Sequence, residues 1–229
     1  MNDATPAHSA LDPLTFEQAR VLGCLMEKEV TTPDSYPLTL NALVNACNQS
    51  TNREPVVSFA EVTVQEALEV LKSRQFVYQL SMAGARVQKF RHNITGKFPA
   101  LEAPEAALLC TLLLRGAQTV GELRQRTERL HNFPDLAAVE AALQKLLSSE
   151  HDVALAVMFP PGQGRKSALY MHTLCGEPVA PVAGAVIVEA APLPPSQREE
   201  DRLWREKMER EVADLRAELQ ALKEKLGEV

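Results

Sequence analysis

No apolar stretch in this 229-residue sequence is long enough to cross a bilayer. The most apolar run, residues 106–114, is far shorter than the roughly 20 residues that a membrane-spanning helix needs. Residues 1–13 contain neither the basic segment nor the apolar segment of a secretory signal peptide. We therefore expect a cytoplasmic protein that has no membrane partner.

Cysteine is scarce, and the motifs of metal, nucleotide and hydrolytic chemistry are absent. The four cysteines lie far apart and form no C-x-x-C pair, so we interpret them as reduced thiols of the core. The five histidines do not have the spacing of metal ligands, and there is no G-x-S-x-G, Walker-type or G-x-G-x-x-G motif. These absences predict a protein that is not an enzyme and holds no metal or cofactor.

Positive charge is also in short supply. The chain has a net charge of −6, with −1 over residues 11–96 and zero over residues 97–176. A domain that binds nucleic acid usually has a clear excess of lysine and arginine. The balance therefore excludes a strongly basic DNA-binding surface and leaves room only for local basic patches.

Two predicted helices have more apolar surface than one domain core can cover. Between Ala106 and Leu114 only Thr111 is polar, so a helix there is apolar all round and must be buried on several sides. A helix over residues 16–29 has a core face and a second apolar face. The second face is formed by Val21, Cys24 and Leu25. We expect it to be covered by the other domain or by another subunit.

Capping residues and hydrophobic periodicity predict the same order of elements twice. Residues 15–18 fit a capping box for the first helix, in which Thr15 and Gln18 bond each other's amide groups, and Ser58 and Thr63 are both candidate caps of the third helix. The first set comprises three helices, at residues 16–29, at 38–49 and ending near 74, followed by strands at 76–82 and 86–92. The second set comprises helices that open near residues 104, 119 and 135, followed by strands at 152–159 and 167–173. Three helices and a two-stranded wing are typical of a winged helix, a variant of the helix-turn-helix. The predicted fold class is therefore mainly α with small β-hairpins (α+β), built from two tandem winged-helix domains.

The chain divides into five predicted segments. They are a disordered lead-in at 1–13, winged-helix domains at 14–96 and 97–176, a Pro/Ala-rich linker at 177–197 and a helix at 198–229. The last helix has apolar residues at alternating heptad positions, namely Met208, Val212, Leu215, Leu219, Leu222 and Leu226. This pattern predicts a coiled coil and hence a homodimer. Because it spans only about three heptads, a solitary solvated helix is the alternative.

Long stretches of the sequence resemble one bacterial family. The first is LTFEQARVLGCLMEKEVTTPDSYPLTLNALVNACNQSTNREPV, and the second half contributes TVGELRQRTERLHNFPDLAAVE and ALYMHTL. These segments are similar to the uncharacterised YceH-like family, and the similarity extends over roughly residues 14–174. The resemblance implies tandem winged-helix domains in a bacterial cytoplasm. It implies no activity and no catalytic residues.

Two functions remain open from the sequence. In a DNA-binding winged helix the third helix enters the major groove. Here the outward positions of the third helix are partly acidic in the first domain and mostly small and uncharged in the second. They are Val62, Glu66, Glu69 and Ser73 in the first domain and Ala138, Ala141, Lys145 and Ser148 in the second. The candidate nucleic-acid contacts are cations elsewhere, namely Arg165, Lys166, Arg124, Arg126, Arg129, Arg86, Lys89 and Arg91.

The commonest use of the fold favours a dimeric DNA-binding regulator. The acidic third helix and the near-neutral domains favour a scaffold that binds another protein. An ordinary solvated surface is the third interpretation of the scattered cations, because acidic residues are interleaved with them.

Overall fold

The computed structural model describes residues 12–81, 87–148, 153–162 and 166–178. The chain divides into two units, Met1–Ala185 and Val186–Val229, and every described residue belongs to the first. The lead-in up to residue 11, most of the predicted linker and the whole terminal heptad helix lie outside the described residues. No helix within the described ranges is long and apolar enough to cross a membrane.

The first three helices are α1 (Phe16–Thr31), α2 (Leu40–Cys47) and α3 (Glu61–Ser73). The predicted capping box of α1 is confirmed, since the Gln18 amide N–H donates to Thr15 Oγ1 and the Thr15 amide N–H donates to Gln18 Oε1. Two boundaries were wrong. Helix α2 starts later than predicted because Thr39 is its cap, and α3 is capped by Ala60, which has no side chain to bond the helix.

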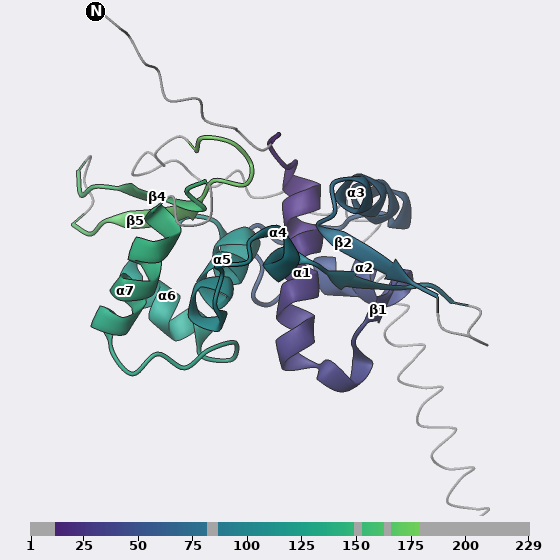
Figure 1. Cartoon of the computed structure of the whole chain (residues 1–229), viewed down its shortest axis with the longest axis horizontal. Coiled ribbons are helices and arrows are strands. Elements are labelled where there is room, and N and C mark those ends of the chain that lie inside the picture. The colour runs from purple at the N-terminus through teal and green to yellow at the C-terminus, as the bar shows by residue number, and fades with distance from the viewer. Residues whose placement is uncertain (1–11, 82–86, 149–152, 163–165, 179–229) are drawn as a thin grey trace, which may run out of the picture. The chain divides into compact units, whose positions relative to one another are not determined.

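The first sheet lies beside these helices (Figure 1). It has the order β1-β3-β2, with β1 (Leu38–Thr39) and β2 (Val77–Leu80) both antiparallel to β3 (Lys89–His92). Two short helical segments that the sequence analysis did not predict, Pro33–Ser35 and α4 (Ile94–Lys97), flank this sheet in the chain. The main elements of the first set are therefore, in chain order, a helix, a short strand, two helices and a hairpin.

The second set of elements follows the same order. It comprises α5 (Ala103–Arg115), α6 (Val120–Thr127), α7 (Leu136–Leu147) and the antiparallel pair β4 (Ala156–Phe159) and β5 (Leu169–His172). Thr119 and Asp135 cap α6 and α7 as predicted. Just before α6, Gln118 forms a β-bridge with Tyr170 of β5. Gln118 therefore takes the place that β1 has in the first set, and the internal repeat is confirmed.

Helices α1 and α5 pack against each other in the middle of the described structure, with the β2–β3 hairpin on one side and the β4–β5 hairpin on the other (Figure 1). The contact is close because Gly23 presents only backbone to α5. The thiol of Cys110 donates to the carbonyl oxygen of Gly23 at 3.4 Å. The two repeats consequently share one continuous apolar core.

This contact explains both of the helices that had too much apolar surface. Val21, Cys24 and Leu25 of α1 are fully buried, and the apolar run of α5 is buried from Ala107 to Leu114. Each of the two helices is buried on more than one side, as predicted, and within this chain each covers the other. The apolar surface of these two helices therefore does not require a second subunit. The homodimer remains a prediction that rests on the terminal heptad alone.

Hydrophobic periodicity predicts that Phe16 faces the core from α1 and that α7 faces it with Leu136, Val139, Leu143, Leu146 and Leu147, but two of these residues lie at the surface. Phe16 and Leu136, each at the first turn of its helix, are 40% and 48% exposed. Phe16 packs edge-on against Phe59 with ring centroids 6.1 Å apart, and the Arg20 guanidinium lies over its other side at 5.2 Å. The predicted inner face of α7 otherwise holds, since Val139, Leu143 and Leu146 are buried.

His172 makes the stability of the fold depend on pH. It is buried at the end of β5, and its Nδ1 has no hydrogen-bond partner among the described residues. Burial lowers the pKa of His172 from 6.5 to about 4, because an imidazolium there would lose its hydration. Between these two values the unfolded chain binds a proton that the folded chain does not, so folding stability falls as pH falls below 6.5.

We expect His172 alone to reduce the free energy of unfolding by roughly 2–3 kcal/mol between pH 7 and pH 4.5. Urea denaturation at both pH values measures this loss in the parent and in a His172→Phe variant, whose ring cannot titrate. The variant should lose correspondingly less stability on acidification. Equal losses in the two proteins would show that the folded state accepts a proton at His172 without cost.

Candidate functional site

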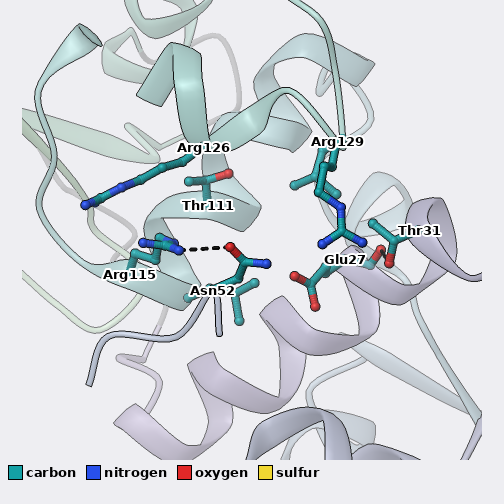
Figure 2. A pocket seen from close by; sticks show the side chains of 9 residues that line it. Glu27, Thr31, Asn52, Thr111, Arg115, Arg126 and Arg129 are labelled. Atoms are coloured by element: carbon teal, nitrogen blue, oxygen red, sulfur yellow. Dashed lines mark hydrogen bonds between the residues drawn. The ribbon is translucent and has the colours of Figure 1, made fainter. Parts of the chain in front are cut away.

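A small pocket lies between the two repeats, where α1 and the loop after α2 face α5 and α6 (Figure 2). Its volume is about 30 Å³, which is room for one or two water molecules. The residues that line it come from both repeats and are Glu27, Thr31, Asn52, Thr111, Leu114, Arg115, Arg126, Arg129 and Leu130. Two of the predicted cations, Arg126 and Arg129, therefore meet here with Arg115, which the sequence analysis did not select.

The loop after α2 is fixed to the second repeat by backbone and side-chain bonds. The Glu54 amide N–H donates to the carbonyl oxygen of Leu114 at 2.9 Å. Arg115 forms an ion pair with Glu54 at 2.7 Å and donates to Asn52 Oδ1 at 2.9 Å. Arg126 lies 3.5 Å from the same Glu54 carboxylate oxygen. Glu54 thus links a loop of the first repeat to two helices of the second.

A buried ion pair supports the other side of the pocket. Arg53 reaches Glu27 with two nitrogens, at 3.2 Å and 2.6 Å, and its Nε donates to the carbonyl oxygen of Ala46 at 3.0 Å. Burial opposes the charge of Arg53, but the hydrogen bonds and the charge of Glu27 outweigh it and raise the pKa of Arg53. Because both partners are buried, removing either one would leave an uncompensated charge in the core.

Of the three arginines that line this pocket, Arg129 is the one that forms no ion pair among the described residues. Figure 2 shows it pointing from the turn after α6 toward Glu27 and Thr31. Among the described residues it has no hydrogen bond or ion pair, whereas the guanidinium groups of Arg115 and Arg126 are already bound to carboxylates. Since two of the three arginines at this pocket are already bound to carboxylates, its geometry suits a clamp between the repeats better than an anion site.

The other predicted cations are scattered over the described surface. Arg124 is bound to backbone, with Nε and Nη2 donating to the carbonyl oxygens of Phe133 and Pro134 at 3.3 and 2.9 Å. Lys89 is half-buried on β3, where Arg91 is exposed and lies over the ring of Tyr78 at 5.6 Å. Lys166 is exposed just before β5. The remaining two, Arg86 and Arg165, lie outside the described residues.

Helix α3 presents an outer face that combines apolar and acidic side chains. The predicted outward positions of this helix are confirmed as exposed, and Val64, Ala67, Leu68 and Leu71 form its buried face. The opposite face is exposed and consists of Glu61, Val62, Gln65, Glu66, Glu69, Val70 and Ser73. Val62 and Val70 are 58% and 39% exposed. The nearest cation of the helix, Lys72, is paired with Glu69 at 2.9 Å. We call this surface the α3 face.

The corresponding face of α7 also has no available cation. Lys145, which the sequence analysis placed outward, forms ion pairs with Glu102 at 2.8 Å and Glu105 at 3.2 Å at the start of α5. Ala138 is half-buried against the core rather than outward. Ala141 is exposed as predicted, and the other exposed residues of this helix are Leu136, Ala137, Glu140 and Gln144.

The buried ion pair beside this pocket was not predicted from the sequence. Arg53 and Glu27 were assigned to no structural role, although Glu27 lies one turn from the core residue Gly23 on a helix with two apolar faces. That position was the one available signal that a carboxylate would be buried and paired. Within the described ranges there is no group of three or more His, Cys, Asp or Glu side chains that could hold a metal ion.

The sequence is similar to a bacterial protein family and to several of its members. Residues 14–163 match the family model described as "Protein of unknown function, DUF480". A UPF0502 protein of Geotalea uraniireducens is 49% identical over 201 residues, which cover 86% of this chain and 87% of the relative. A UPF0502 protein of Vibrio vulnificus is 45% identical over 220 residues, or 94% of each chain. The UPF0502 protein YceH of Salmonella agona is 44% identical over 218 residues, which cover 94% of this chain and 98% of the relative.

Proposed function

The chain belongs to the DUF480 family, also called UPF0502, whose function is unknown, and we propose that it is a protein-binding module made of two winged-helix domains. In this proposal the α3 face binds a protein partner, no reaction is catalysed, and DNA is not the ligand. Three features of the molecule support this: the order of elements in the two repeats, the side chains on the exposed faces of their third helices, and the positions of their lysines and arginines.

The order of elements in both repeats supports the winged-helix assignment. In each repeat the third helix leads into an antiparallel hairpin, and a strand-like residue before the second helix pairs with the hairpin's second strand. This arrangement suits a helix-turn-helix with a wing. The domain boundaries of 14–96 and 97–176 follow from it, with the α1–α5 contact as the interface.

The observation that carries the proposal is the composition of the α3 face. A helix that reads the major groove needs cations and hydrogen-bond donors toward the phosphates and bases. Helix α3 instead has Val62, Glu66 and Val70 in that position, and the charge of Lys72 is already paired with Glu69. Carboxylates repel the DNA backbone, whereas exposed valines flanked by carboxylates suit a protein surface with apolar and basic side chains.

The position of the cations argues in the same direction. Arg91 and Lys166 lie on hairpins that are on opposite sides of the α1–α5 pair (Figure 1), and neither third helix adds a free cation between them. A DNA-binding surface needs several phosphate contacts on one face. A homodimer formed through the terminal heptad would have two α3 faces. Two binding faces in one assembly raise its overall affinity for a partner with two binding sites, which gives the coiled coil a role in a scaffold.

The proposal predicts negligible DNA binding at physiological salt. Fluorescence anisotropy with labelled random and genomic duplexes, from about 50 to 200 mM salt, should give dissociation constants weaker than about 100 μM at the upper end of this range. Changing both Glu66 and Glu69 to Gln should strengthen whatever binding exists, because it removes repulsion from the phosphates. Changing the paired Lys72 to Ala is the matched control and should have little effect.

A different outcome would support the DNA-binding regulator instead. Dissociation constants of micromolar or tighter at 150 mM salt, with a salt slope that falls by about two when Arg91 and Lys166 are both changed to Ala, would place phosphates on the two hairpins. That result would contradict the protein-binding proposal directly.

A further inference from the structure

A second and larger cavity lies between the repeats, beside the C-terminal half of α1, and has a volume of about 250 Å³. Most of its wall is apolar and comes from Met26, Val30, Ile94, Leu101, Ala106, Ala107, Cys110 and Leu130. Its polar lining consists of Glu29, His92, Thr95 and Glu102. An apolar cavity with a few convergent polar groups is the usual form of a small-ligand site, although typical volumes are somewhat larger, at roughly 300–1,000 Å³.

One of these polar groups is held in a fixed orientation. The Ile94 amide N–H donates to Nδ1 of His92 at 3.2 Å, so Nδ1 carries no proton. The proton of the neutral ring is therefore on Nε2, which donates to Glu29 Oε2 at 2.8 Å. Burial lowers the pKa of His92, which keeps the ring in this neutral form although Glu29 acts in the opposite direction. The Glu29 carboxylate is about half exposed, and its other oxygen is left to accept from a ligand.

The rim of this cavity is acidic. Within the described part of the chain, Glu29 is paired with the neutral His92 and forms no ion pair with a lysine or arginine. At the start of α5, Lys145 is shared between the carboxylates of Glu102 and Glu105, which leaves this group with one negative charge in excess. A ligand whose apolar part fills the cavity would consequently be favoured if its polar end carried a positive charge.

We propose that this cavity binds a small molecule with a compact apolar body and a protonated amine, and that the amine pairs with the Glu29 carboxylate. The apolar body would lie between α1 and α5, against Ala106 and Cys110. Binding there would touch both repeats at their interface, so the ligand would also stabilise the arrangement of the two domains. This inference does not depend on what the α3 face binds.

The test uses the full-length protein and three probes with the same aromatic body: 2-phenylethylamine, 2-phenylethanol and phenylacetate. Heteronuclear NMR titration should show saturable shifts for the amine, with a dissociation constant of about a millimolar, as suits so small a ligand. The alcohol should bind several-fold more weakly and phenylacetate more weakly still. Glu29→Gln should remove the advantage of the amine over the alcohol.

Variants that close the cavity provide the decisive comparison. Ala106→Phe fills it and should weaken amine binding at least tenfold, whereas Ala141→Phe, on the exposed side of α7, should leave it unchanged. If Ala106→Phe does not fold, Val30→Trp at the exposed rim blocks the same opening with little demand on the core. No saturable shifts up to about 10 mM, equal binding of amine and carboxylate, or amine binding unchanged when the cavity is closed would each overturn the proposal.

Discussion

Replacing Leu109 by Asp should leave the protein largely unfolded at room temperature. Leu109 is fully buried in α5, the helix that packs against α1 of the first repeat and against α6, α7 and β5 of its own. Leu109 belongs to the shared apolar core, and the buried cation Arg53 is already bound to Glu27, so a carboxylate at this point would compete for a paired charge. Burying an unpaired charge costs several kcal/mol, a large part of the roughly 5–15 kcal/mol that stabilises a typical domain.

Thermal and urea denaturation followed by circular dichroism measure the effect. The matched control is Leu136→Asp, which makes the same change on α7 at a side chain that is 48% exposed. The control should lower the melting temperature by no more than a few degrees. A Leu109→Asp variant as stable as this control would mean that α5 is not buried, and the shared core would have to be abandoned.

Replacing either of two helical glycines by alanine should change the free energy of unfolding, in opposite directions at the two positions. At Gly23 the new carbon would lie 2.9 Å from Leu114 Cδ2 and 3.1 Å from Leu113 Cβ, so α1 and α5 could no longer approach as closely. Overpacking of this kind costs about 1–3 kcal/mol. At Gly121 of α6 there is open space around the same position, so Gly121→Ala should gain the roughly 0.5–1 kcal/mol by which alanine exceeds glycine in helices.

Urea denaturation of the two single variants and the parent tests this pair of signs. The expected order of stability is Gly121→Ala, then the parent, then Gly23→Ala. If Gly23→Ala were also more stable than the parent, helix propensity would dominate at both sites. In that event the close approach of α1 to α5 would not exist in solution.

Local elements of this fold were predictable because their signals are local. A capping side chain and the residue three positions later are enough to place the starts of α1 and α6. The start of α3 was misplaced because its true cap, Ala60, gives no such signal. The excess of apolar surface on α1 and α5 showed that each needed a partner. Hydrophobic periodicity does not identify the partner of an apolar helix face. The sequence therefore did not distinguish contact between two helices of one chain from contact between two chains.

The candidate site was less predictable than the fold, because its contacts join distant parts of the chain. Arg115 and Arg126 bind Glu54, which precedes them by more than sixty residues and belongs to the other repeat. Sequence spacing gives no sign of such pairs, so Arg126 was interpreted as a candidate contact for nucleic acid, and Arg115 and Glu54 were not selected at all. The acidic face of α3 was visible in advance because it depends only on helical periodicity within thirteen residues.

The most direct test of the protein-binding proposal is site-specific crosslinking in bacterial cells. A photoreactive amino acid in place of Val70 samples the α3 face, and the same amino acid in place of Gln144 samples the exposed side of α7 as a control. We expect a discrete protein adduct at Val70 that resists nuclease, is absent at Gln144 and disappears when Glu61, Glu66 and Glu69 are changed to Lys. A nuclease-sensitive adduct at Val70, or the same protein adducts at both positions, would contradict the account.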